Sequence, residues 1–243
     1  PDYTFTDLKP KLVAVSRSGE TTETINALKF FKQKTGQDSL IIGCYPESSM
    51  VRSSSFSLVA KDAQETSVAQ TRSFSNMYLL TQLLAAAAAE NNGFMKELLR
   101  LPEVFPTVVA KNEELVKNIG FDPKFKHFVF LGSGVNYGLA SETMLKMKEM
   151  STSVSEVFSF MEFRHGPMSV ITENSLVIGF VYDARKREEM KVLTDMKSLG
   201  ATTLALIEDE KDSNADFTIG LKSGISELAR GALYLPLLQL LGY

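Results

Sequence analysis

Short apolar runs that alternate with amphipathic helical segments constrain the fold of this 243-residue chain more than any other feature. The first run, residues 12–15, ends in a polar stretch with a glycine, and a helical pattern then places Ile25, Leu28 and Phe31 on one face before Gly36. Further apolar runs occupy residues 40–45, 56–60, 127–131, 176–182 and 203–207. Strands that alternate with helices across short connections form parallel sheets covered by helices.

The second half repeats the order of elements seen in the first half. The strand at 127–131 leads through Gly132-Ser133-Gly134 into a helix at about 137–150, and an amphipathic helix at 185–199 ends before Gly200. We therefore expect an α/β fold of two tandem doubly wound units, flavodoxin- or Rossmann-like, with parallel sheets sandwiched between helices. The expected boundaries are a first unit at 1–100, a connector with three prolines at 101–125, and a second unit at 126–243.

Composition excludes several classes of function. A formal net charge of -3 argues against a surface that binds nucleic acid. The longest apolar stretch, near residues 79–89, is too short to cross a membrane, and no signal-peptide pattern opens the chain. One cysteine and two histidines leave little with which to build a disulfide framework or a zinc site, so we expect a cytoplasmic protein without a metal or cofactor.

The stretch from Ser16 to Thr21 lies where the first apolar strand ends and a helix begins. Backbone N–H groups are free there and the helix dipole favours an anion, while Ser16, Ser18 and Thr21 add hydroxyl donors. Gly19 allows a ligand to approach the backbone. These features suit a phosphate group, but they are equally those of an ordinary helix N-cap, so the residues alone leave both interpretations open.

A second set of candidate residues lies in the second half of the chain. Lys146 and Glu149 share one helix face, and a carboxylate beside an ammonium stays ionised, as a general base requires. His165 precedes Gly-Pro and is expected at a turn. A solvated ion pair and a structural histidine are the alternatives. A third interpretation is a dinucleotide site at Gly132-Ser133-Gly134. It has little support, because position 137 is Tyr where the fingerprint needs its third glycine.

The sequence Ser-Arg-Ser-Gly-Glu-Thr-Thr-Glu-Thr after Val-Ala-Val resembles the phosphate loop of the sugar isomerase (SIS) domain family. This family includes the isomerase half of glutamine:fructose-6-phosphate aminotransferase and aminosugar-phosphate deaminases. The resemblance implies that Ser16, Ser18 and Thr21 hold a sugar phosphate and that Arg17 contributes its backbone. The segment from Glu65 to Phe74 resembles the one that closes the pocket, through Val68 and Gln70, where Gln70 stands in place of the usual serine.

The stretches Lys-Met-Lys-Glu-Met-Ser and Glu-Phe-Arg-His-Gly-Pro resemble the second SIS unit of aminosugar-phosphate isomerases. The resemblance implies that Glu149 moves the proton between C1 and C2, that Lys146 supports it, and that His165 opens the sugar ring across a homodimer interface with shared active sites. It also implies that the loop which normally opens the first unit and a C-terminal tail are missing from this sequence.

The expected function is therefore aldose–ketose isomerisation of a hexose or hexosamine 6-phosphate. Deamination can be an additional outcome of the same reaction, as in glucosamine-6-phosphate deaminases. The alternative is a sensor or regulator that binds a sugar phosphate without catalysis. The presence of both Glu149 and His165 favours the enzyme, because a sensor needs no base.

Overall fold

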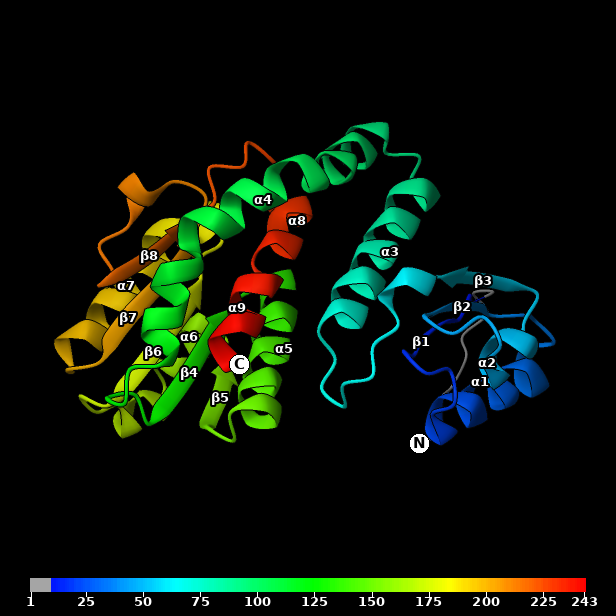
Figure 1. Cartoon of the computed structure of the whole chain (residues 1–243), viewed down its shortest axis with the longest axis horizontal. Coiled ribbons are helices and arrows are strands. Elements are labelled where there is room, and N and C mark those ends of the chain that lie inside the picture. Colours follow the sequence, from blue (N-terminus) through cyan, green and yellow to red (C-terminus); the bar gives the residue numbers. More distant parts are fainter. Residues whose placement is uncertain (1–9) are drawn as a thin grey trace. The chain divides into compact units, whose positions relative to one another are not determined.

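The computed structural model of the protein describes residues 10–243, so residues 1–9 of the expected first unit lie outside the described range. Two parallel sheets are flanked by helices, which confirms the expected α/β class (Figure 1). Backbone contacts divide the chain into two compact units, with the boundary between Glu90 and Asn91.

The first unit contains a parallel sheet of the order β1-β2-β3. Its strands are β1 (Val13–Val15), β2 (Leu40–Gly43) and β3 (Phe56–Val59). Its helices are α1 (Thr22–Thr35), α2 (Ser49–Arg52) and α3 (Arg72–Ala88), with a 3-10 turn at Lys61–Ala63.

The central strand β2 of the first unit is buried from both sides because its side chains alternate between two faces. Ile41 packs with Leu28 of α1 and Met50 of α2. Ile42 packs instead with Met77 of α3 and with neighbouring side chains, including Cys44. Helices therefore cover both faces of this sheet, as the sequence pattern predicts. Cys44 is a free, buried thiol.

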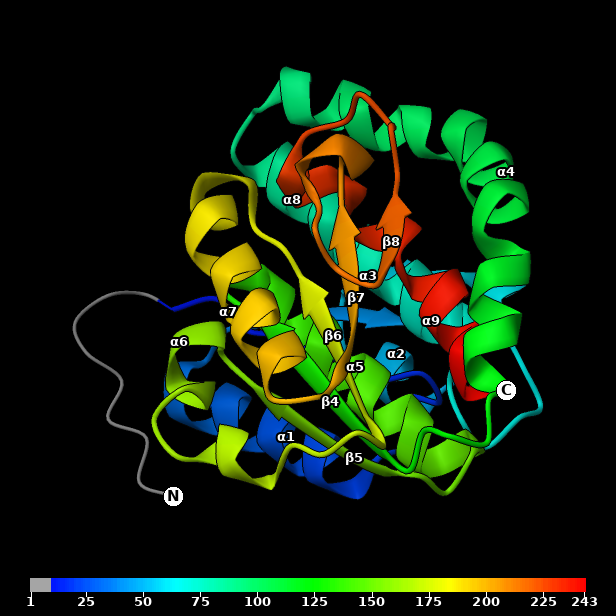
Figure 2. The ribbon, with the colours of Figure 1, turned by 90° about the vertical axis from the view of Figure 1, so that its left-hand side faces the viewer.

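The second unit contains a parallel sheet of the order β5-β4-β6-β7-β8 (Figure 2). Its strands are β4 (His127–Gly132), β5 (Val154–Phe158), β6 (Ser175–Phe180), β7 (Thr202–Ile207) and β8 (Phe217–Gly220). Its helices are α4 (Asn92–Gly120), α5 (Val135–Met150), α6 (Phe160–Phe163), α7 (Lys186–Ser198), α8 (Glu227–Arg230) and α9 (Leu235–Gly242). Strand order reverses between β4 and β6, the place where open α/β sheets bind ligands at their carboxyl ends.

One face of the second sheet packs against α6 and α7, through a cluster that includes Val129, Val177 and Leu193. Helix α5 contacts β4 and β5 and also packs against α9. Both sheet faces are thereby removed from water, which accounts for the continuous apolar runs of β6 and β7.

Helix α4 differs from the sequence expectation of a connector at 101–125. It runs unbroken through Pro102 and Pro106, although each proline removes one backbone N–H from the helix. Buried side chains of α4, among them Leu98, Leu101 and Val116, recur at helical spacing, and the helix packs against α9. This packing outweighs the unfavourable effect of the prolines. The observed boundary at Glu90 thus lies ahead of the expected one, and α4 belongs to the second unit.

Helix α3 begins at Arg72. The side chain of Glu65 accepts hydrogen bonds from the backbone N–H groups of Thr71, Arg72 and Ser73. These groups have no acceptor within the helix, so the carboxylate determines where the helix begins.

Candidate functional site

The loop that joins β1 to α1 in the first unit is held in a compact turn by its own hydroxyl groups. The Ser16 and Thr21 hydroxyls lie 3.0 Å apart, and Ser16 Oγ accepts the Gly19 N–H at 3.2 Å. Ser18 Oγ accepts the Glu20 N–H at 3.2 Å. Thr21 occupies the N-cap position of α1 but makes no side-chain capping bond. The hydroxyls therefore shape the loop without closing the head of the helix.

Gly19 is required at its position for two reasons. Its φ of +65° is unfavourable for other residues, and a Cβ built there would lie 2.2 Å from Ser48 Oγ. The Gly19 carbonyl also accepts the Met50 N–H at 3.1 Å. The turn at Gly19 is thus fixed against the start of α2.

An open cavity of about 300 Å³ lies over this loop in the first unit. Its lining residues are Val15, Ser16, Arg17, Ser18, Thr21, Thr24 and Gln70. Hydroxyls and the positive end of a helix dipole therefore face one opening, which suits a phosphate ester. Five of the six residues that the sequence predicts to bind substrate surround this cavity.

Val68 is the sixth of these residues, and its side chain is 92% exposed. Its backbone carbonyl, and not its side chain, contacts the loop: the carbonyl accepts a hydrogen bond from Arg17 Nη1 at 3.3 Å. The same nitrogen donates to the Ser67 carbonyl at 2.7 Å. The Arg17 side chain therefore reaches the segment that carries Gln70.

Helix α5 of the second unit carries a buried lysine between two carboxylates. Lys146 is 2% exposed and forms ion pairs with Glu149 and, at 3.4 Å, with Glu142. The predicted Lys146–Glu149 pair is present, and the Glu149 side chain is 37% exposed. The sequence reasoning missed Glu142, although a glutamate four residues before a lysine is the spacing that predicts such a pair.

Glu142 and Glu149 differ in their surroundings. Burial raises the pKa of Glu142 to about 7, although the nearby Lys146 ammonium opposes this shift. Glu149 lies at the more exposed end of the same row of side chains. One helix thus presents a buried carboxyl with a raised pKa and a more exposed carboxyl, both beside the same lysine.

His165 lies after α6, at an exposed turn of the second unit. Its backbone N–H donates to the Glu162 carbonyl at 2.9 Å, and Gly166 follows with a φ of +130°, which favours glycine. The imidazole is thus presented at a turn, as the sequence predicts, on a different segment from α5.

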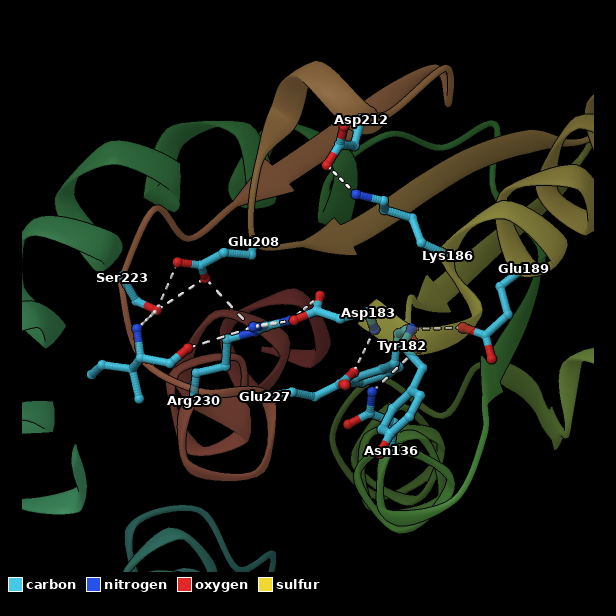
Figure 3. Close-up of polar contacts among 12 residues, drawn as sticks. Asn136, Tyr182, Asp183, Lys186, Glu189, Glu208, Asp212, Ser223, Glu227 and Arg230 are labelled. Carbon is cyan, nitrogen blue, oxygen red and sulfur yellow. Dashed lines mark hydrogen bonds and ion pairs between the residues drawn. The ribbon is translucent and has the colours of Figure 1, made fainter. Parts of the chain in front are cut away.

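Polar side chains also gather at the carboxyl ends of β6 and β7, and Figure 3 shows them. Arg230, which is 3% exposed, binds both carboxylate oxygens of Asp183, at 2.8 and 2.5 Å. Glu189 and Glu227 accept the backbone N–H groups of Tyr182 and Asp183, at 2.6 and 2.8 Å. Side chains of the unit itself therefore accept the backbone N–H groups of Tyr182 and Asp183 at this edge.

Two kinds of feature are absent from the described range 10–243. No helix in it is long and apolar enough to cross a membrane. Nor does it contain a group of three or more His, Cys, Asp or Glu side chains placed to hold a metal ion.

Comparison with known protein families agrees with the two α/β units and the hydroxyl-rich loop described above. The family model described as the SIS domain matches residues 9–87 and 124–224, which is most of the chain. This chain belongs to the SIS domain family. The family predicted from the Ser16–Thr21 loop and the Glu149 region is confirmed.

Relatives of this SIS chain include several aminotransferases. It is 30% identical over 237 residues to a glutamine–fructose-6-phosphate aminotransferase [isomerizing] of Legionella pneumophila, covering 95% of this chain and 39% of the relative. The enzyme of the same name from Sulfurisphaera tokodaii is 27% identical over 244 residues, covering 99% of this chain and 40% of the relative. This chain thus spans about two fifths of the length of these relatives.

Solved structures show the same fold. The C-terminal domain of glucosamine-fructose-6-phosphate aminotransferase from Francisella tularensis superposes with a TM-score of 0.85 at 24% identity, covering 95% of this chain and 69% of that one. A glucosamine-6-phosphate deaminase from Thermotoga maritima has a TM-score of 0.74 at 27% identity, covering 98% and 71%. A tagatose-6-phosphate ketose/aldose isomerase from Escherichia coli has a TM-score of 0.81 at 20% identity, covering 95% and 66%.

Proposed function

We propose that this SIS chain binds a hexose or hexosamine 6-phosphate and interconverts its aldose and ketose forms. The cavity lined by Ser16, Ser18 and Thr21 at the head of α1 is the observation that carries this proposal. Small neutral donors combined with a helix dipole select a phosphate over an uncharged group. The relatives' names add that sugar 6-phosphates are the compounds on which similar chains act.

In this proposal Glu149 is the general base. Aldose–ketose interconversion removes a proton next to a carbonyl and returns it to the adjacent carbon, so one carboxylate can carry out both transfers. Lys146 pairs with Glu149 and is itself held in place by Glu142. The remote phosphate supplies the binding energy that orients the open-chain sugar.

His165 is the proposed group that opens the sugar ring, because an exposed imidazole at a turn can give a proton to the ring oxygen and take it back. We further propose a cytoplasmic homodimer in which the active sites are shared. Loss of ammonia from an amino sugar is a possible second outcome of the same proton transfer. The ratio of ketose formed to ammonia released from glucosamine 6-phosphate distinguishes isomerisation alone from deamination.

The test of this proposal is Glu149→Gln. The substitution keeps the shape of the side chain but removes the base, so turnover of the sugar phosphate should fall at least ~100-fold while its affinity changes less than about twofold. Glu113→Gln, which removes an exposed ion pair with Lys117 on α4, is the matched control. Unchanged turnover in Glu149→Gln would refute the assigned base. Tight binding without turnover in the unmodified protein would instead support a sensor.

A further inference from the structure

The segment between the turn at Lys61–Ala63 and helix α3 forms one wall of the cavity, because Gln70 lines it together with Ser16. We call residues 64–71 the wall segment. It has no helix or strand of its own, so its shape depends on side-chain contacts. Tyr45, Gln64 and Arg72 supply some of these contacts, and Glu65 and Arg17 supply those nearest Gln70 and the loop after β1.

Glu65 closes the wall segment at its far end. Its carboxylate accepts the backbone N–H groups of Thr71 at 3.0 Å and of Arg72 and Ser73 at 3.2 Å. It also accepts the hydroxyls of Thr71, at 2.9 Å, and of Ser73. Burial would raise the pKa of Glu65, but the hydrogen bonds from Ser73 and Thr71 outweigh it and lower the pKa below its ordinary value. The carboxylate is therefore ionised at neutral pH and draws the ends of residues 65–73 together.

Arg17 joins the wall segment to the phosphate loop. Its Nη1 donates to the carbonyls of Ser67 and Val68, at 2.7 and 3.3 Å, in the middle of the wall. Its own carbonyl accepts the Cys44 N–H at 3.2 Å, which anchors the residue to the end of β2. The guanidinium is thus turned toward neutral carbonyl oxygens of the wall.

We propose that Arg17 and Glu65 are positioning residues that set Gln70 against the sugar part of the ligand. This inference rests on the proposed function and changes the role of Arg17 within it. The phosphate is held by hydroxyls and helix N–H groups, and the charge of Arg17 serves the wall. Arg17 consequently strengthens binding of the sugar part of the ligand. It contributes little to the affinity for inorganic phosphate.

The proposal can be tested with Arg17→Met, which keeps the length of the side chain but removes its donors. Binding of inorganic phosphate and of fructose 6-phosphate is measured by calorimetry for the unmodified protein and the variant. We expect phosphate affinity to change less than twofold and fructose 6-phosphate affinity to fall roughly tenfold, the usual effect of losing hydrogen bonds from a charged group. Arg17→Lys, with one donor group able to reach a carbonyl, should recover part of the loss.

Two further variants complete the experiment. Glu65→Gln should show the same selective loss of sugar affinity, because it loosens the other end of the wall. Lys11→Met removes an exposed charge that contacts Gln37 in the same unit, and it should leave both affinities unchanged. An equal loss of phosphate and fructose 6-phosphate affinity in Arg17→Met would overturn the proposal and make Arg17 a phosphate ligand. If the unmodified protein bound neither compound, the proposed function itself would be wrong.

Discussion

Each unit has a loop between a parallel strand and the helix that follows it, and the two loops use their polar groups differently. After β1, hydroxyls of Ser16 and Ser18 shape a turn beneath an open cavity of about 300 Å³. After β6, the backbone N–H groups of Tyr182 and Asp183 bind the carboxylates of Glu189 and Glu227. The first loop offers donors to an external anion, whereas the second binds carboxylates of its own unit.

Position in the fold does not explain this difference between the two loops. Both loops lie at the carboxyl ends of parallel strands, where such folds place their ligands. The side chains available nearby make the difference, because Glu189 and Glu227 already accept the backbone N–H groups of the second loop. We therefore expect one phosphate site per chain, in the first unit.

The largest expected effect is a loss of stability when the Asp183–Arg230 ion pair beside the second loop is removed. Asp183→Ala would leave the buried guanidinium of Arg230 with two long contacts, to Glu208 at 3.7 Å and to the Ile225 carbonyl at 3.5 Å, so the free energy of unfolding should fall by roughly 3 kcal/mol. Urea titration of the second unit's transition measures this change. Asp212→Ala, which removes an exposed pair with Lys186, is the control, with an expected loss below about 0.5 kcal/mol. A loss as small as that of the control would mean that Asp183 does not hold the loop.

The next effect concerns the donors of the first loop. Replacing Ser16 and Ser18 together by Ala should weaken binding of fructose 6-phosphate by roughly 10- to 100-fold, because hydrogen bonds to a charged group are lost. Ser133→Ala, at the head of α5 in the second unit, should change this affinity less than twofold. If the Ser133 variant weakened binding as much as the double variant, the expectation of a single phosphate site in the first unit would fail.

The smallest expected effect is a dependence of stability on pH. Burial raises the pKa of Glu227 to about 7, so the folded protein binds more protons than the unfolded chain between about pH 5 and 7. The free energy of unfolding should therefore fall as pH rises through this range, by about 1 kcal/mol once solvent screening of this partly exposed group is taken into account.

Glu227→Gln isolates this contribution, because it removes the titrating group. Glu142, whose pKa is also raised to about 7 by burial, is present in both proteins and cancels in the difference between them. Unfolding of both proteins is followed by urea titration at pH 5, 6, 7 and 8. A difference between them that stays constant with pH would show that Glu227 is not held neutral by the fold.

The first unit's strand, loop and helix could be predicted from the sequence because each has a strong local signal. An apolar run, a glycine needed at positive φ, and apolar residues at helical spacing identify β1, Gly19 and α1. The residues expected at the phosphate gather around one cavity for the same reason, since most of them belong to this continuous stretch. Their roles in binding and catalysis stay predictions.

The features that the sequence did not predict depend on contacts between distant residues. Strand β5 contains Ser155 and Glu156, so it lacks an apolar run, and its pairing with β4 defines it instead. Helix α4 persists through two prolines because of its packing against α9. The resemblance placed the wall segment at the pocket, but it did not predict the bonds from Arg17 to Ser67 and Val68, which join parts of the chain about fifty residues apart.

Helix α5 carries Glu142, Lys146 and Glu149 on consecutive turns, with no loop between them. A helix is among the stiffest parts of a protein, so these three charges keep their mutual spacing whatever the surrounding loops do. The spacing of these three groups is consequently set by the helix alone. A change elsewhere in the second unit can reach them only by moving α5 as a whole.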